Sequence, residues 1–438
     1  MKYLERFSHV HFIGILGSSL SSLAIICAQQ VALVTGSDLS YNYRYDYLTK
    51  KGIKVSIGAN ISILEDVDLV VYSGAIPLDD EELSYAMSKG ILCVERSVFL
   101  GNLSRDYRHV IAVAGTHGKS TVSGMLSEIF MDAGLLPTCH IGAELTSLGV
   151  GGVAGGYDYF ITEACEYNHS LLTLNPHVAI VLNVDFDHPD CYDGLDSVKR
   201  TFVDFANKVS DDGFCVFGGE CLVDSNSTTV GKEIIADIVK NVDGRYVFTP
   251  VFEGVRGEEI SLKVYGRHNV ANALVSYAVA VRLGIDTRLV SVSLSKYLGI
   301  HRRFEYLPTM SGVRVVSDYA HHPSEIKAVL ATARQVTTTK IVAVFQPHTY
   351  SRTKQLYTEF LSCFDMADEV VIVEEYPARE SPVDGYSAYE LYLGLVPRLN
   401  SVTYLPMANI QEDIAHCIDK DSFVLLLGAG DMPLTLKL

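Results

Sequence analysis

Short apolar runs alternate with helical patterns and glycine-rich turns along almost the whole chain. This alternation predicts an α/β fold with largely parallel strands. Two stretches, Asp80–Lys89 and Asn269–Leu283, have the spacing expected of helices. The apolar runs predict strands at Val10–Ile15, Asp68–Tyr72, Ile91–Val94, Val110–Ala114, Tyr159–Thr162, Val178–Val184, Val313–Val316, Ile341–Phe345, Glu369–Val373 and Phe423–Leu427.

The length of the chain and its breaks predict three domains. At about 150 residues per domain, 438 residues make about three units. A polar break at Asn102–Asp106 precedes a fresh strand, and the pattern starts again near Gly299. The pattern is weaker over residues 211–262, where only Phe214–Phe217 and Arg245–Phe248 are β-like, so the fold there stays open. We expect domains over residues 1–105, 106–299 and 300–438.

Composition and charge narrow the functional classes. A hydrophobic share of 48% with 20% charged residues excludes a mainly disordered chain. The net charge of −17 argues against a general nucleic-acid binder, although it permits a local basic pocket. The nine cysteines form no C-x-x-C pair, and no apolar run approaches the ~18 residues of a membrane span. We therefore expect a protein of a reducing cytoplasm that neither binds nucleic acid nor inserts into a membrane.

A glycine-rich turn between a strand and a helix is the strongest chemical signal. The strand Val110–Ala114 leads into residues 115–121, Gly-Thr-His-Gly-Lys-Ser-Thr, and apolar residues then recur at helical spacing. Such a turn presents backbone N–H groups and a helix dipole to phosphates. Lys119 offers a charge to the β- and γ-phosphates, and Ser120 offers a hydroxyl to Mg²⁺. Val113 stands where the usual pattern has glycine, so the match is to a shortened form, which favours an ATP site.

Two polar clusters follow strands, where ligand sites of α/β sheets gather. Glu163 comes directly after one strand, and Asp185, Asp187 and His188 follow the next. Carboxylate oxygens suit Mg²⁺, which also takes substrate phosphates and water as ligands. The chemistry of the side chains does not choose between Asp185, Asp187 and His188 as the metal ligand.

A longer series of motifs spans the chain in a fixed order. Taken together, these motifs resemble the ATP-dependent Mur ligases over essentially the whole chain, and the last two point to the alanine-adding branch. The series comprises residues 11–14 (HFIG), 36–38 (GSD), 114–120 (AGTHGKS), 163–167 (EACEY), 185–190 (DFDHPD), 266–273 (GRHNVANA), 302–305 (RRFE), 318–323 (DYAHHP) and 346–353 (QPHTYSRT).

The resemblance implies a three-domain α/β enzyme. A Rossmann-like N-terminal domain would bind the UDP-linked substrate, a P-loop domain would bind ATP, and a Rossmann-like C-terminal domain would close over both. The implied reaction joins L-alanine to UDP-N-acetylmuramate through an acyl phosphate, using ATP and Mg²⁺, in peptidoglycan precursor synthesis. The implied setting is the bacterial cytoplasm, and we expect a monomer or weak homo-oligomer.

The resemblance also assigns roles to single residues around ATP. Lys119 and Arg303 would contact the phosphates, and Asp318 would contact the ribose. Ser120, Glu163 and His188 would hold the metal. The remaining ATP contacts would come from the loop residues Gly115, Thr116, His117, Gly118 and Thr121 and from the adenine-contacting residues His268, Asn269 and Asn272.

Substrate residues follow from the same resemblance. His322, His348 and Arg352 would lie near the incoming amino acid. The attacking amine needs a base, and His348 is a candidate because an ordinary histidine pKa of about 6.5 suits that task; His321 and His322 compete with it. The N-terminal turn departs from the family, since Ser19 and Leu20 replace the usual Gly and Met. The expected contacts of the UDP-linked substrate are Gly14, Gly17, Ser18, Ser37, Asp38, Ser73 and Arg96.

Other functions compete with this interpretation. A related recycling ligase adds a preformed tripeptide to the same nucleotide. A non-catalytic nucleotide-binding protein of this fold is a second alternative, but it would be expected to have lost some of Lys119, Ser120, Glu163 and His188. A dinucleotide oxidoreductase does not fit, because the N-terminal turn lacks the full G-x-G-x-x-G pattern and a phosphate loop follows it.

Overall fold

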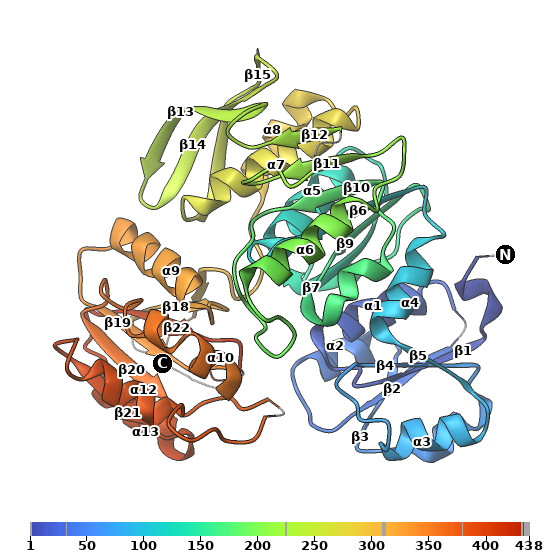
Figure 1. Cartoon of the computed structure of the whole chain (residues 1–438), viewed down its shortest axis with the longest axis horizontal. Coiled ribbons are helices and arrows are strands. Elements are labelled where there is room, and N and C mark those ends of the chain that lie inside the picture. Colours follow the sequence, from blue (N-terminus) through green and yellow to red (C-terminus); the bar gives the residue numbers. More distant parts are fainter. Residues whose placement is uncertain are drawn as a thin grey trace.

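The computed structural model describes residues 2–31, 33–223, 226–308, 312–378, 380–430 and 432. Three sheets built mainly from parallel strands follow one another along the chain, and a smaller antiparallel sheet lies between the second and third (Figure 1). This arrangement confirms the expected α/β class. Among the described helices, none combines the length and the apolar character that a membrane crossing requires.

The first sheet has the order β3-β2-β1-β4-β5, and all its neighbours are parallel. β1 ends at Ile13, earlier than expected, because Gly14 turns with φ +84° and its N–H donates to the Ser37 carbonyl. The elements are η1 (Leu4–Arg6), β1 (His9–Ile13), α1 (Ser18–Ala28), β2 (Leu33–Asp38), α2 (Arg44–Lys50), β3 (Lys54–Ile57), η2 (Ile61–Asp66), β4 (Leu69–Tyr72), α3 (Glu81–Ser88), β5 (Leu92–Glu95) and α4 (Arg96–Ser104).

The second sheet carries the phosphate loop and has the order β12-β11-β10-β6-β9-β7-β8, with only β8 antiparallel to its neighbour. Its central strands are buried apolar runs, as parallel strands covered on both faces are. The elements are β6 (His109–Ala114), α5 (Lys119–Asp132), β7 (Thr138–Leu145), β8 (Val150–Val153), β9 (Tyr159–Glu163), η3 (Tyr167–Thr173), β10 (Val178–Val181), α6 (Leu195–Ala206), β11 (Phe214–Phe217), β12 (Ser227–Thr229), α7 (His268–Arg282) and α8 (Thr287–Lys296).

Most of the region whose fold stayed open from sequence forms the antiparallel sheet. Both β-like pieces expected there are strands: Phe214–Phe217 is β11 of the second sheet, and Arg245–Phe248 lies within β14 of the antiparallel sheet. The small sheet packs beside α7 and α8 at the far end of the central domain (Figure 1). Its strands are β13 (Ile234–Val242), β14 (Arg245–Phe252), β15 (Val255–Arg256) and β16 (Ile260–Tyr265).

The last sheet has the order β17-β18-β22-β19-β20-β21, parallel except for β17. Three of its strands have the bounds expected from sequence. The elements are β17 (Glu305–Leu307), β18 (Arg314–Asp318), α9 (Pro323–Val336), β19 (Ile341–Phe345), α10 (Tyr350–Gln355), α11 (Tyr357–Phe360), β20 (Glu369–Val373), α12 (Ala388–Leu395), β21 (Val402–Leu405), η4 (Met407–Asn409), α13 (Ile410–Asp413), η5 (Ile414–His416) and β22 (Phe423–Leu427).

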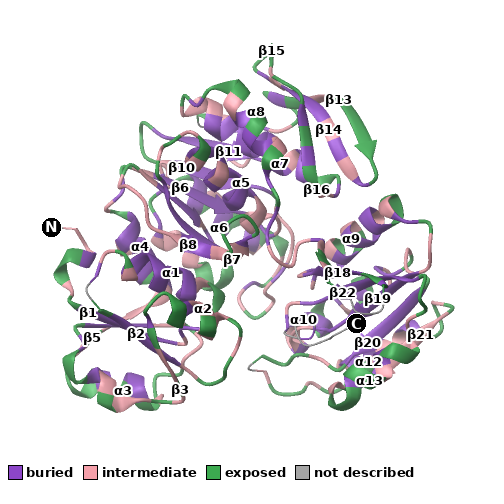
Figure 2. Ribbon diagram, turned by 180° about the vertical axis from the view of Figure 1, so that it is seen from behind, coloured by how far each residue is buried: buried purple, intermediate pink, exposed green. Residues whose placement is uncertain are grey.

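The hydrophobic cores show how the sheets are joined. Figure 2 shows the strands of the three larger sheets mostly buried and the outer helix faces exposed. One core cluster runs through the first sheet and one face of the second, because α1 packs against β7 and β8. The last sheet has clusters of its own, and Phe186 from the segment after β10 packs against one of them. The first two units therefore share one hydrophobic core, and the third has separate ones.

Candidate active site

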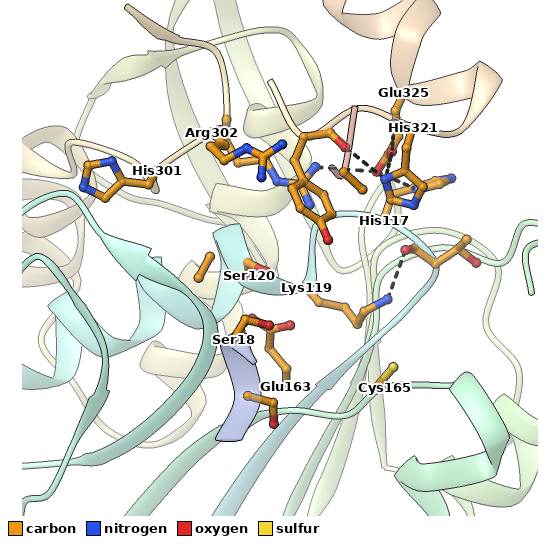
Figure 3. Close-up of a pocket in the computed structure, with 18 of the residues that line it drawn as sticks. Ser18, His117, Lys119, Ser120, Glu163, Cys165, His301, Arg302, His321 and Glu325 are labelled. Carbon is orange, nitrogen blue, oxygen red and sulfur yellow. Dashed lines mark hydrogen bonds and ion pairs between the residues drawn. The ribbon is translucent and has the colours of Figure 1, made fainter. Parts of the chain in front are cut away.

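The three units built on the larger sheets meet around one cavity of about 470 Å³. It is lined by the starts of α1 and α4, the phosphate loop, the ends of β7 and β9, the segment after β10, residues between 301 and 352, and Ala429. Figure 3 shows several of these residues. Residues from all three expected domains thus share one site. The residues expected from sequence that line it are Ser18, Arg96, Thr116, His117, Gly118, Lys119, Ser120, Glu163, Asp187, His188, Arg303, His321, His348 and Arg352.

The phosphate loop joins β6 to α5 and is held by the segment after β10. Gly115 has φ +128°, and a Cβ there would stand 2.9 Å from both N and Cβ of Leu182, so only glycine fits. Thr116 Oγ1 donates to the Asp185 carbonyl at 3.1 Å, and the His117 N–H donates to an Asn183 oxygen at 2.8 Å. Because α5 starts at Lys119, its first free N–H groups lie beside the cavity, where an anion can accept from them.

The Lys119 ammonium is bound by a carboxylate that has no assigned role. Its Nζ donates to both Glu166 oxygens at 3.0 and 2.9 Å, and also to the carbonyls of Gly115 and Thr116. Burial alone would lower the pKa of Lys119, but the Glu166 carboxylate outweighs it and holds the pKa above its usual range. The lysine is therefore charged and already paired before a phosphate arrives.

Three side chains suited to a hard cation converge beside this loop. Ser120, Glu163 and His188 line the cavity from the start of α5, the end of β9 and the segment after β10. One Glu163 oxygen accepts the Gly142 N–H at 2.7 Å, which leaves its other oxygen for a ligand. His188 is held at φ +57°, a conformation that non-glycine residues seldom adopt. The Ser120 hydroxyl and the Glu163 carboxylate next to a phosphate loop are oxygen ligands of the kind that suits Mg²⁺, which completes its shell with phosphates and water.

The segment after β10 also binds the third domain. Arg352 Nε donates to one Asp187 oxygen at 2.9 Å, and Nη2 donates to the other at 3.3 Å. Both side chains are buried, and burial alone would raise the pKa of Asp187, but Arg352 holds it well below its usual range. The paired N–H groups expected to grip an amino-acid carboxylate therefore face Asp187 in this structure.

The candidate bases have unusual pKa values. Burial, together with the charge of Arg352, lowers the pKa of His348 to about 4 and that of His321 to about 3. Burial also lowers the pKa of His322. His348 Nδ1 lies 3.0 Å from Arg352 Nη1, which makes it the acceptor in this pair. These rings are neutral at pH 7, but the ordinary pKa assumed from the sequence does not hold for them.

Arg303 and Asp318 come from the start of the third domain. Arg303 lines the cavity, and its Nη1 lies 3.5 Å from Glu325 Oε1. Asp318 is buried outside the cavity lining and accepts the N–H groups of Phe304 and Ala320, each at 2.8 Å. Burial raises the pKa of Asp318 to about 6. In this structure Asp318 orders the segment that carries Arg303.

The remaining expected residues lie around the cavity rather than on its lining. Asn272 stands next to the phosphate loop, with Oδ1 3.0 Å from where a Cβ on Gly118 would be. Ser37 donates to Glu82, and an Asp38 oxygen accepts the Leu16 N–H at 2.9 Å, so both order the N-terminal turn. The expected residues that do not line the cavity are Gly14, Gly17, Ser37, Asp38, Ser73, Gly115, Thr121, His268, Asn269, Asn272, Asp318 and His322.

Several lining residues were missed from sequence. Glu166 lies inside a motif that drew attention, but its partner Lys119 is 47 residues away in the chain. Asp187, a candidate metal ligand from sequence, lines the cavity as the partner of Arg352 instead. Glu325 follows the His321-His322-Pro323 motif, and its carboxylate lies 3.1 Å from His117 Nδ1 (Figure 3). Its only sequence signal is its place in the first turn of α9, where an acid favours the helix. Other missed lining residues are Tyr43, Arg44, His140, Glu144, Cys165, His301, Arg302 and Tyr319.

Comparisons with known proteins agree along the chain. Relatives named UDP-N-acetylmuramate–L-alanine ligase occur in Caldanaerobacter subterraneus subsp. tengcongensis (37% identity, 98% of this chain and 96% of the relative) and Acetivibrio thermocellus (38%, 98% and 94%). The solved UDP-N-acetylmuramate-alanine ligase of Thermotoga maritima has a TM-score of 0.82 at 27% identity, covering 97% of this chain and 96% of that one. A murein peptide ligase from Psychrobacter arcticus shares the fold, with a TM-score of 0.75 at 24% identity over 97% and 96%.

Three family models match consecutive parts of the chain. Residues 9–108 match the Mur ligase family catalytic domain, and residues 113–280 match the Mur ligase middle domain. Residues 302–430 match the Mur ligase glutamate ligase domain. With the full-length relatives and the shared three-domain architecture, these matches show that the chain belongs to the Mur ligase family.

Proposed function

We propose that this protein joins L-alanine to UDP-N-acetylmuramate with the hydrolysis of ATP to ADP and phosphate, in peptidoglycan precursor synthesis. The observation that carries the proposal is the single cavity in which Lys119, Ser120 and Glu163 of the central unit meet Arg303 and Arg352 of the third. The names of the full-length relatives at 37–38% identity support L-alanine as the amine.

The chemistry explains why such a cavity is needed. A carboxylate is a poor electrophile, so it first attacks the γ-phosphate of ATP to form an acyl phosphate and ADP. The neutral amine of alanine then attacks the acyl carbon, and the tetrahedral intermediate expels phosphate. Lys119 and Arg303 would stabilise the charge that develops on the transferred phosphoryl group, while the cavity aligns the reactants. For Lys119 this requires the phosphates to compete with Glu166.

We assign Mg²⁺ to Ser120 and Glu163, whose oxygen atoms fit it, and to His188 on the resemblance to the family. When bound, the ion would neutralise phosphate charge and orient the γ-phosphate. We assign the UDP-linked substrate to the N-terminal unit, residues 1–105, with Ser18 and Arg96 as the contacts that line the cavity. ATP would bind residues 106–299, and residues 300–438 would close over it. The bacterial cytoplasm, where the nucleotide substrates occur, is the proposed location, with a monomer or weak homo-oligomer as the working form.

An ADP-release assay tests the function. We expect ADP only when both UDP-N-acetylmuramate and an amino acid are present, with L-alanine preferred over glycine and L-serine. The tripeptide L-alanyl-γ-D-glutamyl-meso-diaminopimelate is the decisive comparison, because preference for it would make this a recycling ligase. Equal ATP hydrolysis with and without the muramyl nucleotide would contradict any ligase assignment.

A further inference from the structure

Three side chains lie close together next to the phosphate loop. The proposed reaction gives them no shared role. His117 comes from the loop, Asp185 follows β10, and His322 precedes α9 in the third domain. Their nearest donor atoms all lie within 4.8 Å of one another. His117 Nε2 and His322 Nδ1 are 3.4 and 3.8 Å from the same Asp185 oxygen, Oδ2. Ligand atoms around a tetrahedral zinc ion stand about 3.4 Å apart, so small shifts would complete the geometry.

The three ligand atoms surround one position, which the Ser324 hydroxyl occupies in this structure. Ser324 Oγ lies 2.7 Å from His322 Nδ1, 3.1 Å from His117 Nε2 and 3.2 Å from Asp185 Oδ2. A cation there would displace this hydroxyl or keep it as a fourth ligand. Its route from solvent passes Asp185, whose side chain is 41% exposed.

The far nitrogen of each ring has the partner that metal-binding histidines usually have. His322 Nε2 lies 3.2 Å from the Phe186 carbonyl and donates to it, which leaves Nδ1 unprotonated toward the cluster. His117 Nδ1 lies 3.1 Å from Glu325 Oε1, as Figure 3 shows, so a ring that donates from Nδ1 presents Nε2 to the cluster. Although burial alone would lower the pKa of His117, Glu325 and Asp185 raise it to about 9, so a cation bound at Nε2 replaces a proton there. A carbonyl or carboxylate behind the ring fixes its tautomer and strengthens it as a ligand.

We propose that His117, Asp185 and His322 form a binding site for a Zn²⁺-type divalent cation, separate from the Mg²⁺ site and bridging the central and third domains. Two imidazoles and one carboxylate suit zinc better than Mg²⁺, which prefers oxygen ligands. Because the ligands come from both domains, the bound ion holds them together. It also fixes His117 of the phosphate loop, so it inhibits an enzyme that must open to exchange nucleotides.

Zinc binding can be measured on the purified full chain without turnover. We expect calorimetry with Zn²⁺, in excess Mg²⁺, to show one site per chain. Asp185→Asn and His322→Gln should each weaken it at least about tenfold. Asp185 is partly exposed, so its variant tests the site even where His322→Gln affects folding. Co²⁺ bound there should show ligand-field absorption without a thiolate charge-transfer band, which separates this site from the free cysteines.

Two matched variants locate the ion. His177→Gln removes another histidine that has acidic and histidine neighbours, Asp212 and His109, and it should leave zinc affinity unchanged. Glu163→Gln alters the proposed Mg²⁺ site and should also leave it unchanged. The proposal is overturned if wild type binds no zinc, if Asp185→Asn and His322→Gln bind it as wild type does, or if either matched variant abolishes binding. None of these outcomes depends on whether alanine is the amine substrate.

Discussion

Lys119 lines the cavity and forms an ion pair with the buried Glu166. Glu166 is 2% exposed and contacts the ammonium with both oxygens. A buried charge left without its partner is costly, which explains why the Lys119 ammonium is paired with a buried carboxylate. When phosphate binds, it replaces one anionic partner of Lys119 with another, so the charge on the lysine need not change.

Glu166→Gln should therefore destabilise the nucleotide-free protein. We expect the free energy of unfolding to fall by about 3 kcal/mol, because the buried Lys119 ammonium loses its counter-charge. Glu220→Gln is the matched control: it breaks the exposed pair with Lys199, whose side chains are 41% and 69% exposed, and should cost below about 1 kcal/mol. Urea unfolding measures both, and equal losses would mean that the Lys119–Glu166 pair contributes no more than a surface pair.

Replacing Lys119 and replacing Glu163 should impair turnover in different ways. Lys119→Ala removes the charge at the transferred phosphoryl group, so we expect kcat to fall at least about 10²-fold. Glu163→Ala should keep nucleotide binding while losing turnover that depends on Mg²⁺. Nucleotide binding by fluorescence and ADP release over a Mg²⁺ titration separate the two. Near-normal turnover of Glu163→Ala at limiting Mg²⁺ would show that the metal lies elsewhere.

At the scale of elements, the segment after β10 holds together the phosphate loop, the cation ligands and the third domain. Sequence predicted its position well, since parallel strands buried on both faces are continuous apolar runs and polar residues mark their ends. It did not predict that Asp187 pairs with Arg352, because the partners are 165 residues apart. The antiparallel sheet was hard to predict for another reason: β13 is largely exposed and lacks a clear apolar face.

Arg352 lies on α10, and replacing it tests the proposed contact with the amino-acid substrate. An arginine can bind carboxylates through two parallel N–H groups, which lysine cannot reproduce. In this structure the two groups bind Asp187, so the carboxylate of alanine would have to compete with it. Losing one charge-assisted hydrogen bond costs about 1.5–3 kcal/mol, so with such an exchange we expect Arg352→Lys to raise the KM for L-alanine by about tenfold or more. The KM for ATP should stay close to wild type. Steady-state kinetics decide, and a rise in the KM for ATP alone would place Arg352 at the nucleotide site.

His140 on β7 links the first two sheets and should make the protein acid-sensitive. Its Nε2 lies 2.9 Å from Ser19 Oγ, its Nδ1 lies 2.9 Å from Thr162 Oγ1, and burial with the nearby charge of Arg96 lowers its pKa to about 3. Below pH 6.5 the unfolded chain takes up a proton that the folded ring does not, so stability is lost as pH falls toward 3.

We expect this loss to reach about 2 kcal/mol at pH 5. His140→Gln removes the proton uptake while an amide can keep hydrogen bonds to Ser19 and Thr162. Urea midpoints of the variant should therefore change less between pH 8 and pH 5 than those of wild type. Parallel curves for the two proteins would show that His140 does not cause the acid sensitivity.

For the whole molecule, the sequence motifs predicted many of the residues that line the cavity but not how the domains touch. Residues from 18 to 429 line the same cavity, and the family resemblance had implied that all three domains contribute to one site. The contacts that bring the third domain over it, His117 with Glu325 and Asp187 with Arg352, join residues far apart in the chain. Such pairings leave no periodic signal in a single sequence.

These contacts also bear on domain closure. Arg303 lies at the start of the third domain and lines the cavity, where ATP phosphates would attract it. A hinge near Gly299, which has φ +97°, can supply the rotation. We expect ATP plus UDP-N-acetylmuramate to reduce the radius of gyration in small-angle scattering, and Arg303→Ala to weaken that compaction. Arg334→Ala, which removes a partly exposed pair with Asp368 inside the third domain, should compact as wild type does. A scattering profile unchanged on saturation would mean that the third domain already holds its closed position without nucleotide.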